Sequence, residues 1–259
     1  MKKSKIAVLV AMVVVLAFSL AACGGSDKSS SEKTVYKVGT EPTFPPFDTT
    51  DEDQNIVGLD MDLIKAIGED QDFDVEFENL SFDGLIPALK AGNIDIVAAG
   101  MNKDDEDRQK EVDFSDSYYE SKLFVAVTED NTTIKSVEDL TPDMKVAAQT
   151  GTTGASKVKE LKDAGKIKEA VILDGLDTCM MKLINGDVSA VINDKPVTEA
   201  YMKKQPDKIK MVGEALNAEN YGFAVQKGNA ELVEKINNGL KHIKENGTYD
   251  KLVDEWFNK

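Results

Sequence analysis

The chain has 259 residues, of which 41% are hydrophobic and 30% are charged, and its 47 acidic and 31 basic residues give a formal net charge of -16. These proportions are typical of a soluble globular protein with a real core, and the length suits one large domain or two ordinary ones. Such an excess of negative charge opposes binding to nucleic acid, and one histidine with two cysteines leaves too few ligands for a zinc site.

The N-terminal 33 residues have the pattern of a targeting segment and a tether. Three early lysines precede the apolar stretch 6–20, which is too short to span a membrane and matches a secretory signal peptide. The following Leu20-Ala21-Ala22-Cys23 resembles a bacterial lipobox, although an ordinary signal peptide could also contain this cysteine. We therefore expect a lipoprotein signal peptide at 1–22, lipidation of Cys23, and a flexible Gly/Ser-rich tether at 23–33 on the outer face of the cell membrane.

The remaining chain alternates short apolar runs with helical patterns, which predicts an α/β fold. Strands are expected at 35–39, 74–78, 94–98, 123–127, 145–148, 189–192 and 222–225. Helices are expected at 60–69, 82–91, 154–164, 178–185, 196–203 and 229–245, with a short last helix from about Thr248. Residues 85–100 and 180–194 both run helix, glycine turn, strand and loop, which indicates two similar units with a ligand cleft between them.

Three single residues bear on function. Arg108 is the only arginine and is a candidate for bidentate binding of a carboxylate, although a solvated loop residue would look the same. His242 lies in a helical pattern and is expected on a helix surface, so no catalytic residue is predicted. If Cys23 carries a lipid, Cys179 has no disulfide partner and should pack as a small buried apolar side chain.

Several motifs occur in a fixed order: GTEPTFPPF at 39–47, GLDMDL at 58–63, FDGLIPAL at 82–89, QTGTT at 149–153, VINDKP at 191–196 and YGFAV at 221–225. With them the chain resembles, over about residues 35–257, the solute-binding proteins of bacterial ABC-type polar amino acid importers (extracellular solute-binding protein family 3). The resemblance implies a type II periplasmic-binding-protein fold, in which two lobes close on the ligand like a clamshell. It implies lobe 1 at 34–121 and 219–259, lobe 2 at 122–218, and two crossing strands near 121–127 and 221–225.

The resemblance also implies how the two charged ends of an amino acid are held. Arg108 falls on the family's carboxylate-binding arginine, and Thr152 and Thr153 begin a helix whose N–H groups would add donors. Asp194 falls on the acidic position that pairs with the α-ammonium group, although an acid at this place would also suit a helix N-cap before Pro196.

Gly100 and Asn102 are expected beside the ligand. The stretch from Gly100 to Arg108 is one residue longer than the usual family loop, and its acidic run 104–107 replaces a Thr-containing turn. We expect that run to be a solvated loop.

The ligand side chain is expected between Phe44 and Phe82, which match the family's aromatic pair, with Glu41, Gln149 and Asn193 at its far end. Burying a leucine or valine there would leave the two amides and the acid unpaired. Two ligand classes remain: glutamine, pairing with the amides, and lysine, arginine or histidine, pairing with Glu41.

The leading prediction is a monomeric receptor, without catalytic activity, metal or cofactor, that delivers a free amino acid to ABC permease subunits in the membrane. One alternative is an enzyme similar to cyclohexadienyl dehydratase, because such enzymes resemble this fold. The other is a sensory ligand-binding domain, which is disfavoured because the sequence has no signalling segment before Lys259.

Overall fold

A computed structural model describes residues 33–258, and its compact unit starts at Thr34. The predicted signal peptide, the lipidation site Cys23 and all of the predicted tether except Lys33 lie outside the described residues. Between residues 33 and 258, no helix is both long and apolar enough to cross a bilayer.

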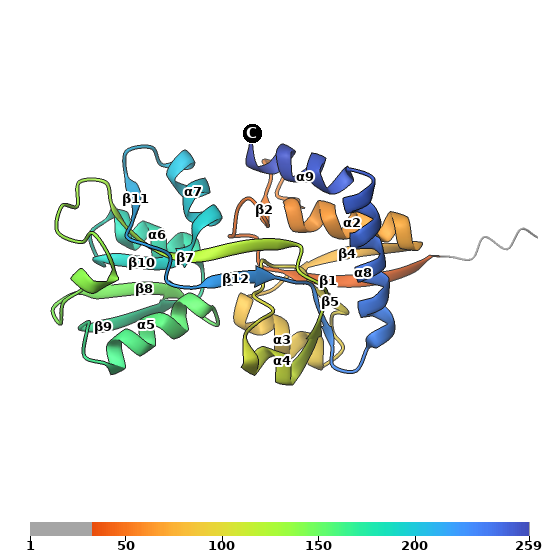
Figure 1. Ribbon diagram of the computed structural model, residues 1–259, viewed down its shortest axis with the longest axis horizontal. Coiled ribbons are helices and arrows are strands. Elements are labelled where there is room, and N and C mark those ends of the chain that lie inside the picture. The colour runs from red at the N-terminus through yellow and green to blue at the C-terminus, as the bar shows by residue number, and fades with distance from the viewer. Residues whose placement is uncertain (1–32, 259) are drawn as a thin grey trace, which may run out of the picture. The chain divides into compact units, whose positions relative to one another are not determined.

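The first and last parts of this unit share a five-stranded sheet with the strand order β4-β1-β5-β13-β6 (Figure 1). Its strands are β1 (Thr34–Thr40), β4 (Phe73–Asn79), β5 (Ile96–Val97), β6 (Val112–Phe114) and β13 (Ala224–Gln226). β1 is parallel to β4 and β5, and β13 is antiparallel to β5 and β6. The short strands β2 (Thr49–Thr50) and β3 (Ile56–Val57) pair only with each other.

Helices cover both faces of this sheet (Figure 1). The helices α2 (Leu59–Gln71), α8 (Ala230–Glu245) and α9 (Thr248–Phe257) lie on one side, and α3 (Phe82–Lys90) and α4 (Glu106–Glu111) on the other. The sequence of α8 explains both where this helix begins and which of its faces packs on the sheet. Its N-cap Asn229 accepts a hydrogen bond from the N–H of Leu232, and Leu232, Ile236, Leu240 and Ile243 form one buried stripe.

The middle of the chain forms a second sheet of six strands, with the order β11-β7-β10-β8-β9 and β12 paired to β7. These strands are β7 (Tyr119–Thr128), β8 (Lys145–Gln149), β9 (Glu169–Leu173), β10 (Ala190–Asp194), β11 (Ile209–Val212) and β12 (Ala218–Tyr221). Its helices are α5 (Thr153–Asp163), α6 (Leu176–Ile184), α7 (Lys195–Lys204) and the 3-10 turn η1 (Val137–Asp139).

The strand β10 is buried on both faces, and its side chains alternate between them. Val191 packs in the cluster that contains residues of α6 and α7, whereas Ile192 packs in the cluster that contains residues of α5. Successive side chains of a strand point to opposite faces, so the next two residues, Asn193 and Asp194, must also diverge. This alternation decides which of them can face a ligand.

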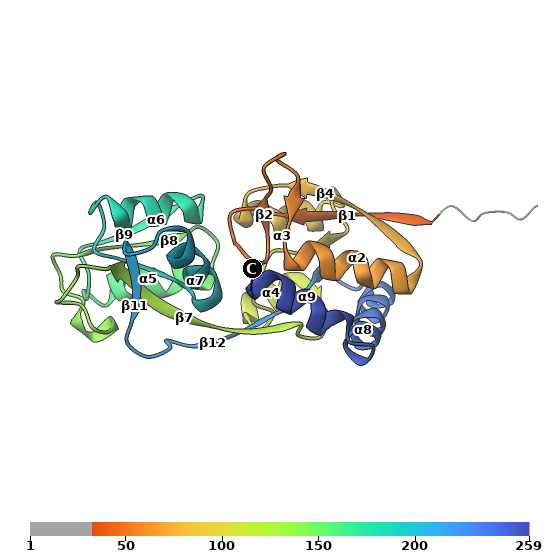
Figure 2. The same ribbon diagram turned by 90° about the horizontal axis from the view of Figure 1, so that it is seen from above.

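Two strands connect the sheets, as the clamshell fold requires (Figure 2). β7 is longer than predicted because it has two sets of partners: residues 119–122 pair with β12, and residues 123–128 pair with β10 and β11. The second crossing lies earlier than predicted, since β12 ends at Tyr221 and the chain then enters β13 of the five-stranded sheet.

The single residues fall as follows. Cys179 is fully buried, as expected, and the other cysteine, Cys23, lies outside the described residues. His242 lies on the exposed side of α8, where its Nδ1 is 2.7 Å from Asp70 Oδ2. The prediction of a solvated loop at 104–107 is wrong, because Asp105 is the N-cap of α4 and its Oδ1 accepts the N–H groups of Asp107 (3.0 Å) and Arg108 (2.9 Å).

Candidate functional site

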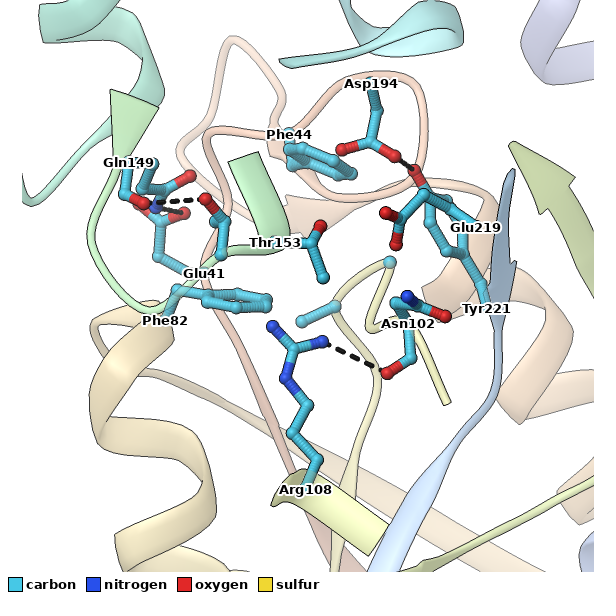
Figure 3. Close-up of a pocket in the computed structure, with 13 residues that line it drawn as sticks. Glu41, Phe44, Phe82, Asn102, Arg108, Gln149, Thr153, Asp194, Glu219 and Tyr221 are labelled. Atoms are coloured by element: carbon cyan, nitrogen blue, oxygen red, sulfur yellow. Dashed lines mark hydrogen bonds between the residues drawn. The ribbon is translucent and has the colours of Figure 1, made fainter. Parts of the chain in front are cut away.

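A pocket lies where strands of both sheets end, beside the loops that follow β1 and β5 on one side and β8 and β10 on the other. Ten of the eleven residues predicted at the ligand line it (Figure 3): Glu41, Phe44, Phe82, Gly100, Asn102, Arg108, Gln149, Thr152, Thr153 and Asp194. The other lining residues are Ala99, Glu219 and Tyr221. The cavity between them measures about 20 Å³, which is room for about one water molecule.

Arg108 reaches this pocket from α4 and bridges loops of both sheets. Its Nη1 donates to the carbonyl oxygen of Asn102 (3.1 Å) and its Nη2 to that of Gly151 (2.9 Å), and its guanidinium lies 5.4 Å from the ring centre of Phe82. The side chain is buried, and burial lowers the pKa of Arg108 despite the nearby acids Asp105 and Glu219. A guanidinium has five N–H donors, so three remain for a ligand carboxylate.

Asp194 ends β10 and points into the opposite side of the pocket. Its Oδ1 accepts hydrogen bonds from the hydroxyls of Tyr221 (2.5 Å) and Ser121 (3.1 Å). Burial raises the pKa of Asp194 to about 6, and these two donors limit the rise. Asp194 occupies the N-cap position of α7, but its side chain makes no capping hydrogen bond, so the carboxylate is directed to the pocket.

Glu41 and Gln149 form the other end of the pocket, separated from Asp194 by the two phenylalanines (Figure 3). The Glu41 carboxylate accepts hydrogen bonds from the Thr43 hydroxyl (2.8 Å) and from Gln149 Nε2 (2.8 Å). Gln149 Nε2 gives its second hydrogen bond to the carbonyl oxygen of Asp174 (3.0 Å). Both amide hydrogens of Gln149 are therefore used within the protein. Burial raises the pKa of Glu41.

The rings of Phe44 and Phe82 flank the space between these two ends (Figure 3). Phe44 is buried and Phe82, at the first position of α3, is half-buried. Gly100 has a φ of +54°, and a Cβ at this position would lie 2.6 Å from Phe44 Cε1. Only glycine therefore combines this left-handed backbone with the position of the Phe44 ring.

Thr152 and Thr153 mark the start of α5. The Thr152 hydroxyl accepts the N–H of Ala155 (3.0 Å) and donates to the carbonyl oxygen of Gln149 (2.7 Å), so this residue caps the helix. Thr153 is the first residue of the helix. The N-terminus of α5, with the positive end of its dipole, therefore lies at the pocket, as an anion requires.

The two predicted asparagines differ in placement. Asn102 lines the pocket, but its Oδ1 already accepts the N–H groups of Asp104 (3.1 Å) and Asn220 (3.2 Å). Asn193 does not line the pocket, because it points to the other face of β10, where its Nδ2 donates to Thr198 Oγ1 (3.2 Å).

Glu219 is a pocket residue that the sequence reasoning missed. It is 1% exposed, lies on β12, and accepts hydrogen bonds from Asn217 Nδ2 (2.7 Å) and from the Thr153 hydroxyl. Burial, reinforced by the nearby Asp194, raises the pKa of Glu219 to about 7. Tyr221 was also missed, although it opens one of the quoted motifs and donates to Asp194. A four-residue strand gives little periodicity by which either residue could be found.

Comparison with known proteins matches the chain to one family. The family described as "Bacterial extracellular solute-binding proteins, family 3" matches residues 36–259. ABC transporter arginine-binding protein 1 of Escherichia coli (strain K12) is 34% identical and aligns with 88% of this chain and 92% of its own length. The arginine-binding extracellular protein ArtP of Bacillus subtilis (strain 168) is 32% identical, with 96% of each chain covered.

Solved structures agree with these matches. An ancestral arginine-binding protein bound to arginine is 44% identical, has a TM-score of 0.82, and covers 87% of this chain and 99% of its own. An ancestral arginine-binding protein bound to glutamine is also 44% identical. It has a TM-score of 0.80 and covers 88% of this chain and 100% of its own. An ancestral amino acid-binding protein, a precursor of cyclohexadienyl dehydratase, is 38% identical, with a TM-score of 0.79 and coverage of 86% and 95%.

Proposed function

The chain belongs to family 3 of the bacterial extracellular solute-binding proteins, and we propose that it binds a free amino acid with a cationic side chain, of the arginine, lysine or histidine class. It would carry this ligand between its two lobes to an ABC importer. The choice of ligand rests on one observation: the end of the pocket formed by Glu41 and Gln149 presents hydrogen-bond acceptors.

That end offers acceptors and no free donor. The amide hydrogens of Gln149 are used by Glu41 and Asp174, which leaves its Oε1 and the Glu41 carboxylate for a ligand. A guanidinium or ammonium group has donors only and satisfies both acceptors. A glutamine side chain also carries a carbonyl oxygen, which would be buried here without a donor.

The charges around the pocket support the same ligand class. Among the described residues that line it, Glu41, Asp194 and Glu219 are acids and Arg108 is the single cation. An amino acid backbone is a zwitterion and leaves this excess of negative charge unchanged, whereas a cationic side chain offsets part of it. Buried charges are stable only when paired, so the lining favours a ligand with a net positive charge.

The backbone of the ligand has a partner at each end. The three unused donors of Arg108 and the N-terminus of α5 at Thr153 suit the α-carboxylate. Asp194, with Glu219 beside it, suits the α-ammonium group. Phe44 and Phe82 would hold the aliphatic part of the side chain between their rings.

Glutamine is the second candidate. An ancestral arginine-binding protein with 44% identity to this chain was solved with glutamine bound, so a related pocket accepts that amide. In this chain glutamine would bind more weakly than arginine, because its carbonyl oxygen lacks a donor beside Glu41.

The small cavity indicates how the ligand enters. Most of the residues that line it are buried, so we infer that the lobes move apart to admit an amino acid. We place the lobe boundaries at 34–121 with 219–259 and at 122–218, so that the two strands β7 and β12 belong partly to each lobe and the other strands divide by sheet. The crossings β7 and β12 would act as hinges.

We further propose that the protein is not an enzyme, acts as a monomer, and is anchored outside the cell by a lipid on Cys23. The family name supports the extracellular location, and the lipobox-like sequence supports the anchor. The dehydratase alternative has one supporting feature, since Asp194 and Glu219 have pKa values of about 6 and about 7 that suit general acid catalysis. The Glu41 carboxylate at the end of the pocket would repel the acidic substrate of such an enzyme.

A thermal-shift screen of the twenty amino acids on ligand-stripped protein tests the proposed function. A ligand at 100 times its dissociation constant stabilises the folded state by about 2.7 kcal/mol. We expect arginine, lysine or histidine to give the largest shift, with glutamine below them. A shift with aliphatic amino acids alone would refute the assignment, and turnover of an aromatic acid would support the enzyme.

A further inference from the structure

Two aspartates lie buried behind the pocket, and no role described so far involves them. Asp48 follows the loop that carries Phe44, and Asp60 lies in the first turn of α2; both are 0% exposed. Their backbone segments are in direct contact: the N–H of Asp60 donates a hydrogen bond to the carbonyl oxygen of Phe47, the residue before Asp48 (3.0 Å). A Cβ on Gly58 would lie 2.8 Å from Asp48 Cα, which explains the glycine there.

Each carboxyl group is satisfied on one oxygen only. Asp48 Oδ2 accepts the Thr40 hydroxyl (2.9 Å). Asp60 Oδ2 accepts the backbone N–H of Gly100 (2.8 Å) and the Tyr118 hydroxyl (2.7 Å). The Oδ1 atoms of both aspartates are buried without a hydrogen-bond partner. Buried polar atoms are rarely left in this state, so these two call for an explanation.

Among the residues that the structure describes, no cation is paired with either aspartate. None of the ion pairs formed by residues 33–258 includes Asp48 or Asp60. The titratable groups that face the pair are Glu41 from the loop after β1, Tyr118 before β7 and Tyr201 on α7, and all three are acids. Two unpaired carboxylates in such a site would be strongly destabilising.

We propose that Asp48 and Asp60 share a proton through their two Oδ1 atoms, and that this pair is a positioning device for the pocket loop at Gly100–Asn102. A protonated carboxyl group donates one hydrogen bond and a carboxylate accepts one, so a single proton between Asp48 and Asp60 would satisfy both unpartnered oxygens. Burial raises the pKa of Asp60 to about 7 and that of Asp48 well above its usual range, which agrees with a proton held at neutral pH.

Asp60 transmits the effect of this proton to the binding site. By accepting the N–H of Gly100, Asp60 fixes the residue at which a Cβ would collide with the Phe44 ring, and Asn102 lies two residues further along the same loop. Its bond from Tyr118 fixes a ring that stacks on Phe223 at 4.5 Å. Loss of the shared proton would place two negative charges behind this loop and loosen it.

Infrared difference spectroscopy tests the proton directly, without any ligand, so the result is independent of the proposed function. At about pH 8, above the pKa values of Asp194 and Glu219, we expect the wild-type protein to show the carbonyl band of a protonated carboxyl group. The band should be lost in Asp48→Asn and retained in the control Asp53→Asn, which makes the same change at an exposed loop residue. Absence of the band from wild-type protein overturns the proposal, even if no variant folds.

The stability profile provides the second readout. A carboxyl group whose pKa is raised in the folded state favours folding less as pH rises from its unfolded pKa to its folded pKa. The melting temperature of wild-type protein should therefore fall as pH rises from about 4 to beyond about 8, more steeply than that of Asp48→Asn.

Asp60→Asn keeps an acceptor for the N–H of Gly100 and should preserve the ligand affinity, whereas Asp60→Leu should lose it. Equal pH profiles for wild type and Asp48→Asn would contradict the shared proton.

Discussion

Gln149 Nε2 donates a 2.8 Å hydrogen bond to Glu41 Oε2 across 108 positions of sequence. The two residues come from different sheets, since Glu41 follows β1 and Gln149 ends β8. The bond from Arg108 Nη2 to the carbonyl oxygen of Gly151 joins the same two sides of the pocket. A ligand bound between these two hydrogen bonds would therefore contact both sides of the pocket, which links recognition of its two ends to closure.

Changing Glu41 to Gln should separate the two ligand classes. The variant removes the negative charge but keeps a polar group, so affinity for arginine should fall by about 10- to 100-fold, corresponding to the 1.5–3 kcal/mol of a hydrogen bond to a charged group. Affinity for glutamine should change far less. Calorimetric titration of both amino acids measures this, with Glu52→Gln at an exposed site as control. Equal losses for both ligands would show that Glu41 does not discriminate.

Replacing Arg108 with Lys keeps the charge and loses the two-pronged geometry. We expect affinity to fall by more than about tenfold, or about 1.4 kcal/mol, for every amino acid that binds. The control is the reverse exchange Lys110→Arg on the exposed side of the same helix, which should leave affinity unchanged. Near-native affinity of Arg108→Lys in calorimetry would return Arg108 to the role of a structural bridge.

The cap of α4 should matter for both folding and binding. Asp105→Ala removes the acceptor for the N–H groups of Asp107 and Arg108 and should lower the free energy of unfolding by about 1 kcal/mol. Because Arg108 lies on this six-residue helix, ligand affinity should fall as well. Urea denaturation and calorimetry measure the two effects, and Asp105→Asn should restore both. If the variant loses stability but keeps its ligand affinity, the Asp105 cap does not influence the binding site.

Binding of a cationic ligand should strengthen as pH rises. The pKa values of Asp194 and Glu219 are raised to about 6 and about 7, so at acid pH these groups hold protons that a bound cation would displace. Affinity for arginine should therefore increase between about pH 5 and about pH 8 and then level off. Calorimetry in buffers of different ionisation enthalpy should detect proton release. Affinity that is constant over this range would exclude both groups from the ligand contact.

Closure should be visible in solution. Because the contacts proposed for the ligand come from both lobes, binding favours the closed arrangement. Small-angle scattering of ligand-stripped protein should give a larger radius of gyration than the same protein saturated with arginine. An unchanged radius at saturation would contradict the clamshell mechanism.

Much of the site follows from the sequence because motif residues sit at the ends of well-patterned strands and helices. The failures have local causes. α4 has only six residues and no apolar repeat, so its acidic start resembles a solvated loop. Asn193 and Asp194 are adjacent in β10, so only one of them can face the ligand. Glu219 lies in a four-residue strand whose partner in β7 is remote in sequence.

The ligand class could not be derived from sequence for a different reason. It depends on which atoms of Gln149 are free, and this is decided by a hydrogen bond to the backbone oxygen of Asp174, which no side-chain pattern encodes. The pairing of Asp48 with Asp60 is likewise a product of the fold, since Gly58 permits the close backbone contact between their segments.

The central claim is that the pocket selects a cationic amino acid, and competitive calorimetry on ligand-stripped protein tests it most directly. Arginine, lysine, histidine, glutamine and leucine are titrated separately, and each weak ligand is then displaced by arginine. We predict one site per chain, with a basic amino acid bound more tightly than glutamine by at least about tenfold, or about 1.4 kcal/mol, and no binding of leucine. Strong binding of leucine with none of the basic amino acids or glutamine would contradict the pocket assignment.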